Sequence, residues 1–368
     1  MATHLLRPTA LVRDDQLVEG EGVLIEAGRI TAVGAELTGD TEEQLEGTLL
    51  PGAIDLQVNG AGGRSVEEAS AEALDMVAET VRAGGATAFL PTLITAPFDL
   101  LLEQVTAVAA WCQAYDGPGA RPLGLHVEGP FLEVPGAHDA QHFVDPSPER
   151  VAALLDAAAG TLRLVTLAPV RAGAVEATAR LKDAGVCVSI GHASSTTNFG
   201  ACVEAGADLA THLFNTMGGL HHRDDGVAAR VLDEVRLSAC LIADGHHVGD
   251  AMLRNAWRIL GPERAILVTD SVAAAAQPDG EYLLGGLKVQ KSGGTVRTPE
   301  GALAGSTLVM RDAVEHAQRV IPELSTADLA RLTAANPARL LGDSSRGAIA
   351  PGMRAELSLL TANGLSAL

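Results

Sequence analysis

The chain has 368 residues, 47% hydrophobic and 20% charged, so it can bury a core large enough for one barrel with a small appendage or for two domains. Its formal net charge of −20 and its scattered basic residues exclude nucleic acid as a bulk partner. Four cysteines without C-x-x-C spacing, the lack of an apolar run near ~18 residues and the lack of a signal-peptide pattern predict a cytoplasmic protein with no membrane partner.

The two ends of the chain share one pattern. Short alternating runs at residues 10–12, 22–26 and 30–33, separated by turn signals, predict antiparallel strands, and the tail after residue 345 has the same character. We therefore predict that residues 1–48 and 345–368 pair in one small β-sandwich domain.

Between these ends, short apolar runs alternate with helical segments. The runs suit strands buried on both faces of a parallel sheet, and they cover residues 54–58, 86–90, 123–127, 162–167, 186–190, 209–213, 237–243 and 265–269. The helical segments include residues 70–83, 148–159, 172–184 and 250–260. Eight strands alternating with helices predict a (β/α)8 barrel over residues 49–344, with a strand-rich insertion near 278–304. A doubly wound sheet is the alternative.

Metal-competent side chains stand at the ends of four of these runs: Glu128, His192, His212 and Asp270. Barrel enzymes place their active sites at the C-terminal ends of the strands. Two imidazoles and a carboxylate suit Zn²⁺ or Fe²⁺, and three protein ligands leave a coordination position for water, whose pKa the ion lowers. Asp270 is then the expected proton carrier. Read alone, each histidine is more often a core residue, and Asp270 could cap a helix. Together the four predict a metal-dependent hydrolase.

Several motifs add a family resemblance. PGAIDLQVNG at residues 51–60 resembles the opening of the amidohydrolase superfamily, except that Gln57 and Asn59 occupy the two usual histidine positions. GLHVEGPF at 124–131, GAH at 136–138, GHA at 191–193, THLFN at 211–215, ADGHHV at 243–248, VTD at 268–270 and LAGS at 303–306 closely resemble the N-acetylglucosamine-6-phosphate deacetylases.

The resemblance implies a set of roles. Glu128, His192 and His212 would hold one divalent metal ion, Zn²⁺ foremost, with Fe, Mn and Co as alternatives. Asp270 would be the catalytic acid and base, and His138 would polarise the acetamide carbonyl or stabilise its oxyanion. Gln57 and Asn59 would be remnants of a second metal site. The residues implied in substrate binding are Ala137, Asn215, Thr216, Arg223, His247, Leu303, Ala304 and Gly305. In the family the arginine at position 223 can reach across a dimer interface, which implies a homodimer with shared sites.

The predicted reaction is hydrolysis of N-acetyl-D-glucosamine 6-phosphate to D-glucosamine 6-phosphate and acetate, so the expected partner is a small amino-sugar phosphate. A deacetylase of N-acetylgalactosamine 6-phosphate is the nearest alternative, because the sequence does not disclose the contacts to C4. A cyclic-amide hydrolase is disfavoured because no lysine ends the 162–167 run, and a catalytically silent scaffold because the four site residues are retained. We expect His126 to lie in the core or support the site, and His221 and His222 to be solvated.

Overall fold

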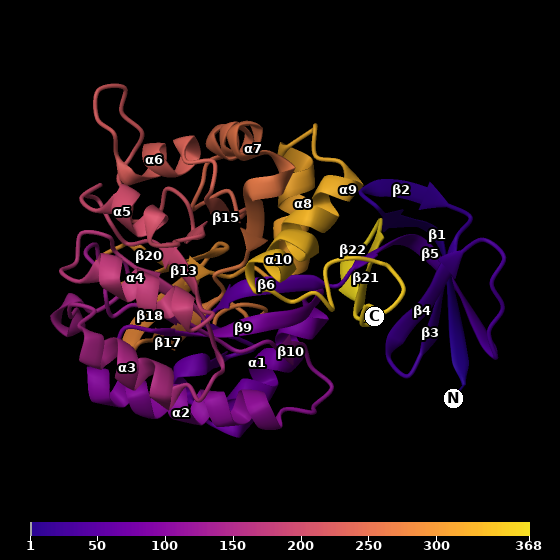
Figure 1. The fold of residues 1–368 in the computed structure, drawn as a ribbon, viewed down its shortest axis with the longest axis horizontal. Helices are drawn as coiled ribbons and strands as arrows, with labels where there is room; N and C mark the ends of the chain where they lie inside the picture. Colours follow the sequence, from indigo (N-terminus) through magenta and orange to yellow (C-terminus); the bar gives the residue numbers. More distant parts are fainter. Residues whose placement is uncertain (1) are drawn as a thin grey trace.

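The computed structural model describes residues 2–368, so residue 1 of the predicted 1–48 segment lies outside it. Within this range a parallel barrel is surrounded by helices, with a separate sheet to one side (Figure 1). The barrel strands are β6 (Ala53–Val58), β9 (Ala86–Ile94), β11 (Leu125–Glu128), β12 (Leu162–Leu167), β13 (Cys187–Ile190), β14 (Leu209–Ala210), β15 (Ser238–Ile242) and β16 (Ala265–Val268). Neighbouring strands run parallel in chain order, and a parallel bridge between Val58 and Ser271 joins the first strand to the last. The predicted barrel is therefore confirmed.

Helices follow most of the strands. They are α1 (Ala71–Ala83), α2 (Phe98–Ala114), α3 (Pro148–Ala157), α4 (Ala174–Asp183), α5 (Phe199–Glu204), α6 (Val227–Asp233), α7 (Asp250–Arg264) and α8 (Met310–Val320). Local sequence explains their starts: the Ser70 hydroxyl accepts a hydrogen bond from the Ala73 N–H at 3.3 Å and caps α1. Leu74, Val77 and Val81 then bury one face of α1, as the helical period requires.

Smaller elements complete the barrel unit. They are β7 (Gly60–Ala61), β8 (Arg64–Ser65), η1 (Val66–Glu68), β10 (Arg121–Pro122), η2 (Ala140–His142), α9 (Thr326–Ala330), the π-helical turn η3 (Arg331–Ala335) and α10 (Asn336–Leu340). No helix among the described residues is long and apolar enough to cross a membrane.

The barrel interior changes from apolar to polar along the strands. Leu164, Cys187 and Leu209 belong to an apolar cluster inside the barrel, against which Leu340 and Leu341 pack. Two residues further along the same strands stand Thr166, Ser189 and Thr211, all buried. Side chains on one face of a strand recur every second residue, so each strand carries a core residue and then a polar one toward the same interior. The polar end is the end that carries the predicted site.

Strands from both ends of the chain share one sheet. It contains β1 (Thr3–Arg13), β2 (Gln16–Glu19), β3 (Gly22–Glu26), β4 (Arg29–Gly34), β5 (Thr41–Pro51), β21 (Leu357–Thr361) and β22 (Gly364–Ala367). β21 runs antiparallel to β5, with Leu357 opposite Pro51, whereas β1 and β5 run parallel. Only Gly52 separates β5 from β6, so this sheet leads directly into the barrel. The division into domains at residues 48 and 345 stays a prediction.

A separate, antiparallel sheet lies between β16 and α8 in the sequence. Its strands are β17 (Gly280–Leu284), β18 (Leu287–Ser292), β19 (Thr295–Arg297) and β20 (Leu303–Ser306). Ser306 forms a parallel bridge with Ser271, directly after Asp270. This bridge places β20 beside the end of the last barrel strand, at the mouth of the barrel.

Candidate active site

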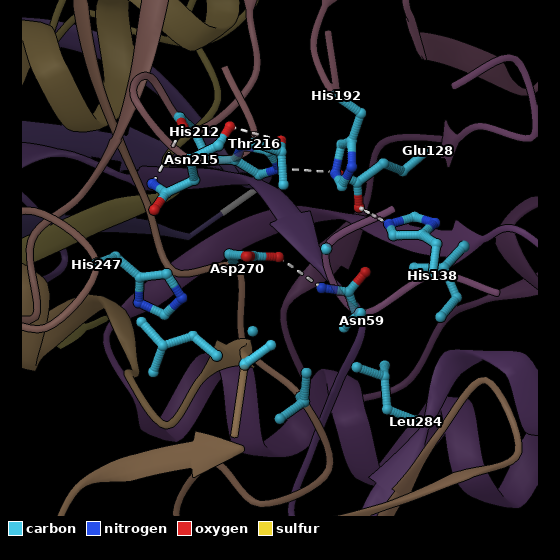
Figure 2. Close-up of a pocket in the computed structure, with 17 residues that line it drawn as sticks. Asn59, Glu128, His138, His192, His212, Asn215, Thr216, His247, Asp270 and Leu284 are labelled. Atoms are coloured by element: carbon cyan, nitrogen blue, oxygen red, sulfur yellow. Dashed lines mark hydrogen bonds and ion pairs between the residues drawn. The ribbon is translucent and has the colours of Figure 1, made fainter. Parts of the chain in front are cut away.

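A pocket of about 260 Å³ opens at the C-terminal ends of the barrel strands (Figure 2). It contains most of the predicted site residues, together with apolar residues from the loops and from β17 and β20. The lining residues are Asn59, Ile94, Glu128, Gly136, Ala137, His138, His192, His212, Asn215, Thr216, His247, Asp270, Val272, Leu284, Ala302, Leu303 and Gly305. The barrel therefore brings together side chains that lie more than 200 positions apart in the sequence.

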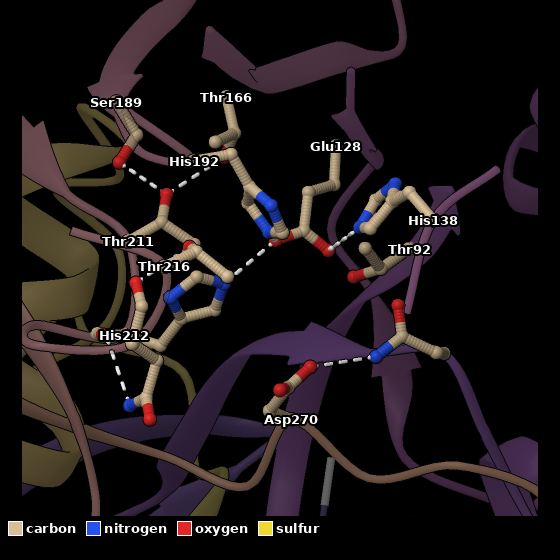
Figure 3. Close-up of polar contacts among 12 residues, drawn as sticks. Thr92, Glu128, His138, Thr166, Ser189, His192, Thr211, His212, Thr216 and Asp270 are labelled. Carbon is tan, nitrogen blue, oxygen red and sulfur yellow. Dashed lines mark hydrogen bonds and ion pairs between the residues drawn. The ribbon is translucent and has the colours of Figure 1, made fainter. Parts of the chain in front are cut away.

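Three imidazoles converge on the Glu128 carboxylate (Figure 3). Its Oε1 lies 3.1 Å from His192 Nε2 and 2.9 Å from His212 Nε2, and its Oε2 lies 3.6 Å from His138 Nε2. All four side chains are at least 94% buried. Ligand atoms of Glu128, His138 and His192 lie within 4.8 Å of one another, a spacing that could hold a metal ion. This group differs from the predicted ligand set in its third member.

The hydrogen bonds of His192 fit a cation at this place. His192 Nδ1 lies 2.7 Å from the Val134 carbonyl oxygen, which only accepts hydrogen bonds, so Nδ1 carries the proton. Burial, and to a smaller extent the charge of His138, lowers the pKa of His192 to about 4. The ring is therefore neutral, and its Nε2 presents a lone pair. That lone pair faces the Glu128 carboxylate. A cation between the two acceptors would satisfy both, as in other metal sites where a backbone carbonyl orients a histidine ligand.

His138 is oriented in the opposite sense. The Thr95 N–H donates to His138 Nδ1 at 3.4 Å, and Thr95 Oγ1 lies 3.0 Å from the same atom. A neutral histidine whose Nδ1 accepts a hydrogen bond carries its proton on Nε2, the atom that faces the pocket. His138 therefore offers a donor rather than a lone pair. Its orientation favours His212 as the third ligand of the predicted set.

The charges around Glu128 shift its pKa and that of His212. Burial raises the pKa of Glu128, but its contacts with His138, His192 and His212 outweigh burial and hold it well below its usual value. Burial lowers the pKa of His212, but the hydrogen bond and charge of Glu128 outweigh burial and the net shift is upward. The cluster is thus built around a carboxylate that stays ionised.

Asp270 stands on the other side of the pocket, two residues after β16. Its Oδ1 accepts a hydrogen bond from Asn59 Nδ2 at 2.8 Å. Burial, followed by the charge of Glu128, raises its pKa to about 6. A carboxyl group with a pKa near neutrality can both accept and return a proton.

Three of the predicted metal-binding and catalytic residues have left-handed backbone conformations, which are uncommon for residues other than glycine. The φ angles are 48° at His192, 30° at His212 and 51° at Asp270. Such conformations cost of order 1–3 kcal/mol each and persist where the surroundings determine them. Here the chain turns sharply at the strand ends and directs these side chains into the pocket.

The other wall of the pocket is polar. His247 Nδ1 lies 2.6 Å from Asp244 Oδ2, and the His247 N–H donates to Asp244 Oδ1 at 2.8 Å. Asn215 Nδ2 donates to the His212 carbonyl oxygen at 3.1 Å, and the Thr216 hydroxyl donates to the Asn215 carbonyl oxygen at 2.5 Å. These contacts hold Asn215, Thr216 and His247 at the pocket surface, where the prediction places substrate-binding groups.

Three predicted residues lie outside the pocket lining of the described chain. Ala304 packs into an apolar cluster with Val272, because neighbours on β20 alternate between faces. Gln57 is buried, and its two amide atoms have no hydrogen-bond partner among residues 2–368. Arg223 is exposed on the loop before α6. His221 and His222, on the same loop, are also exposed.

The sequence prediction did not assign roles to Thr95, Val134 and Asp244, which orient His138, His192 and His247. Asp244 carried a signal, because it follows a predicted strand directly. Thr95 and Val134 carried none: a threonine after an apolar strand and a backbone carbonyl in a loop are common in any barrel. Only the tertiary structure brings them to the imidazoles.

Known proteins resemble this chain over nearly its full length. The model of the amidohydrolase family matches residues 48–366. The N-acetylgalactosamine-6-phosphate deacetylase of Escherichia coli O157:H7 is 36% identical over 362 residues, which cover 97% of this chain and 95% of that protein. The N-acetylglucosamine-6-phosphate deacetylase of Bacillus subtilis strain 168 is 32% identical over 371 residues, covering 98% and 93%.

A solved structure agrees with this likeness. The Mycobacterium smegmatis N-acetyl-D-glucosamine-6-phosphate deacetylase, in a mutant complex with N-acetyl-D-glucosamine 6-phosphate, superposes with a TM-score of 0.92 at 31% identity. The match covers 100% of this chain and 98% of that one. The resemblance thus extends to the terminal sheet and the insertion as well as the barrel.

Proposed function

Because the chain belongs to the amidohydrolase family, we propose that it is a deacetylase that hydrolyses N-acetyl-D-glucosamine 6-phosphate to D-glucosamine 6-phosphate and acetate. The observation that carries the proposal is the pocket itself. It sets a buried carboxylate–histidine cluster opposite Asp270, whose pKa is raised to about 6, with the oriented donor His138 beside the cluster. Deacetylases of N-acetylgalactosamine 6-phosphate and of N-acetylglucosamine 6-phosphate resemble this chain over nearly its full length.

Glu128, His192 and His212 would hold one divalent metal ion, with Zn²⁺ foremost and Fe, Mn or Co as alternatives. Two imidazoles and one carboxylate match the ligand preference of these ions. Gln57 and Asn59 stand where a second ion would need histidines, and carboxamides are poor ligands, so one ion per subunit is proposed. When bound, the ion lowers the pKa of water and polarises the acetamide carbonyl.

The chain's own residues would carry the remaining steps. Asp270 accepts the proton of the attacking water and delivers it to the amide nitrogen as the C–N bond breaks, so that acetate and the free amine leave. His138 donates its Nε2 hydrogen to the carbonyl oxygen as negative charge develops there. The Asn59 amide, which donates to Asp270 Oδ1, holds the carboxylate in place between the two transfers.

Substrate binding would use the polar wall of the pocket and a second subunit. His247, Asn215 and Thr216, with Ala137, Leu303 and Gly305, offer contacts to the sugar and its phosphate. Arg223, which lies outside the pocket of its own chain, would reach the phosphate in the site of a partner in a homodimer, where a guanidinium can bind a phosphate with two parallel hydrogen bonds. Four free cysteines support action in the cytoplasm.

N-acetylgalactosamine 6-phosphate is the second candidate substrate, because the E. coli relative that acts on it is 36% identical to this chain. The two sugars differ only at C4, so the same reaction would serve both.

Acetate release from both sugars by the metal-loaded protein tests the proposal. Asp270→Asn and a chelated sample should lose turnover, and Asp116→Asn, a change of an exposed acid, should keep it. Preference for the gluco sugar supports the proposal, and strong galacto preference selects the second candidate. Release of acetate from neither sugar by metal-loaded protein would contradict both.

A further inference from the structure

Directly below the site residues, a chain of hydrogen bonds crosses the barrel interior. Ser189 Oγ lies 2.6 Å from Thr211 Oγ1, and Thr211 Oγ1 lies 2.7 Å from Thr166 Oγ1. Thr166 Oγ1 lies 2.8 Å from His126 Nε2, and His126 Nδ1 lies 3.2 Å from the Leu56 carbonyl oxygen. All four side chains are at least 99% buried. Figure 3 shows the hydroxyl part of this chain beside the glutamate–histidine cluster.

The donor and acceptor of every hydrogen bond in this series follow from the end at which His126 meets the Leu56 carbonyl oxygen. The Leu56 carbonyl only accepts, so His126 Nδ1 carries a proton. With that proton on Nδ1, the Nε2 atom of a neutral imidazole carries a lone pair, and it accepts from the Thr166 hydroxyl at 2.8 Å. Thr166 therefore donates to His126, Thr211 donates to Thr166, and Ser189 donates to Thr211. Each hydroxyl hydrogen is used once, and no proton has to be shared.

The chain joins the strands that carry the candidate metal ligands. His126 stands two residues before Glu128, Ser189 three residues before His192, and Thr211 directly before His212. Gly191 packs closely against two members of the network, because a Cβ at this position would lie 2.7 Å from Thr166 Cγ2 and 3.0 Å from Thr211 Cβ. One continuous set of hydrogen bonds thus links the strands or strand ends that precede the three ligands.

At its far end the chain reaches β6, the strand that positions Asp270. The Asp270 N–H donates to the Gln57 carbonyl oxygen at 3.0 Å, and Asn59 donates to the Asp270 carboxylate. Because positions 57 and 59 hold carboxamides, β6 offers no imidazole to the metal site at those positions. The bond from His126 to Leu56 is therefore a direct polar tie between the ligand-bearing strands and β6.

We propose that the Ser189–Thr211–Thr166–His126 chain is a positioning network that sets Glu128, His192 and His212 relative to Asp270, in place of a second metal ion. The network rests on the proposed function for its purpose, but it is tested by metal binding. Removing groups that orient metal ligands typically weakens metal affinity by about 10- to 100-fold. Substitution within the network should have an effect of this size.

The experiment compares Thr211→Val with Thr211→Ser and Thr178→Val. Valine keeps the shape of threonine and removes its hydrogen bonds. Thr178 is an equally buried control outside the network, and its hydroxyl donates to the Ala174 carbonyl within α4, at 2.7 Å. Zn²⁺ affinity is measured by competition with a chelating dye, the visible spectrum of the Co²⁺-loaded protein reports ligand geometry, and thermal unfolding of the metal-free protein reports stability.

We expect Thr211→Val to weaken Zn²⁺ binding by about 10- to 100-fold and to change the Co²⁺ spectrum. Thr211→Ser should restore both, and Thr178→Val should leave both unchanged. Ser189→Ala, a smaller change at the end of the chain, gives the same comparison if Thr211→Val does not fold. Unchanged affinity and spectrum, even with a lower unfolding temperature, would show a purely structural network and overturn the proposal. Wild-type protein that binds Zn²⁺ but releases no acetate would instead refute the proposed function.

Discussion

Asp55, on the first barrel strand and next to the last one, makes the free energy of unfolding depend on pH. It lies on β6 and is 1% exposed. Its Oδ2 accepts from the Thr269 hydroxyl at 2.6 Å, and its Oδ1 accepts from the Thr269 N–H at 3.2 Å and the Gln57 N–H at 3.3 Å. Burial dominates over these hydrogen bonds and, with the charge of Asp270, raises the pKa of Asp55 from 3.8 to about 7.

The perturbation that tests this is Asp55→Asn. The asparagine carbonyl can accept from the Thr269 and Gln57 N–H groups, and its NH₂ can donate to the Thr269 hydroxyl. That hydroxyl can then donate to the Gln57 carbonyl oxygen, which already lies 3.4 Å away. The variant keeps the bonds of the protonated acid and cannot become charged.

The sign follows from the raised pKa. A buried acid with a raised pKa contributes stability that is fully present below its unfolded pKa of 3.8 and is lost as the pH rises through the folded value of about 7. The difference is about three pH units at ~1.4 kcal/mol each, so up to ~4 kcal/mol is at stake. Asp55→Asn should match the wild type near pH 4 and exceed its stability by up to that amount at pH 8.

Urea unfolding of the metal-free protein at a series of pH values measures the difference directly. Asp116→Asn, which changes an exposed acid, should show almost no pH-dependent difference. A stability difference for Asp55→Asn that does not grow with pH, or a variant less stable at pH 8, would refute the reasoning.

Four further predictions follow from the site. Asn59→Ala removes a hydrogen bond to the Asp270 carboxylate worth about 1.5–3 kcal/mol, so the acid limb of the pH profile of kcat/KM should move up by about 1–2 pH units. An acid limb that does not move would show that Asp270 is not the group whose ionisation this limb reports. Gln57→Met removes amide atoms that lack partners among the described residues and should raise the unfolding free energy by about 1–3 kcal/mol; a loss would mean that the amide is bound. Because the pKa of His212 is raised, protons compete with the ion, and metal affinity from dye competition should fall as the pH drops from about 8 to about 5.5; constant affinity would argue against His212 as a ligand. Gly305 has φ +63°, and a Cβ at this position would lie 2.9 Å from the Asp270 carbonyl oxygen, so Gly305→Ala should lower kcat/KM by about tenfold or more. Unchanged kinetics would show that β20 can shift enough to accommodate the methyl group without displacing Asp270.

The sequence by itself determined the barrel and much of its chemistry. Runs such as residues 162–167 and 237–243 are rich in apolar residues because strands of a parallel barrel are covered on both sides, so their number and spacing are visible without a structure. Glu128, His192, His212 and Asp270 were identifiable because polar side chains at strand ends break that apolar pattern. The presence of Gln57 and Asn59 at two positions where the family usually has histidines was likewise visible within one short motif.

Only the tertiary structure decided how these groups work together. Which nitrogen of His138 or His192 carries the proton depends on Thr95 and the Val134 carbonyl, and these contacts arise from loop packing. The hydroxyl chain below the site depends on neighbouring strands lying in register, which no single strand encodes. Hydrophobic periodicity is a property of one segment, whereas a pKa or a hydrogen-bond direction is a property of the distances between segments, and those distances exist only once the barrel has closed.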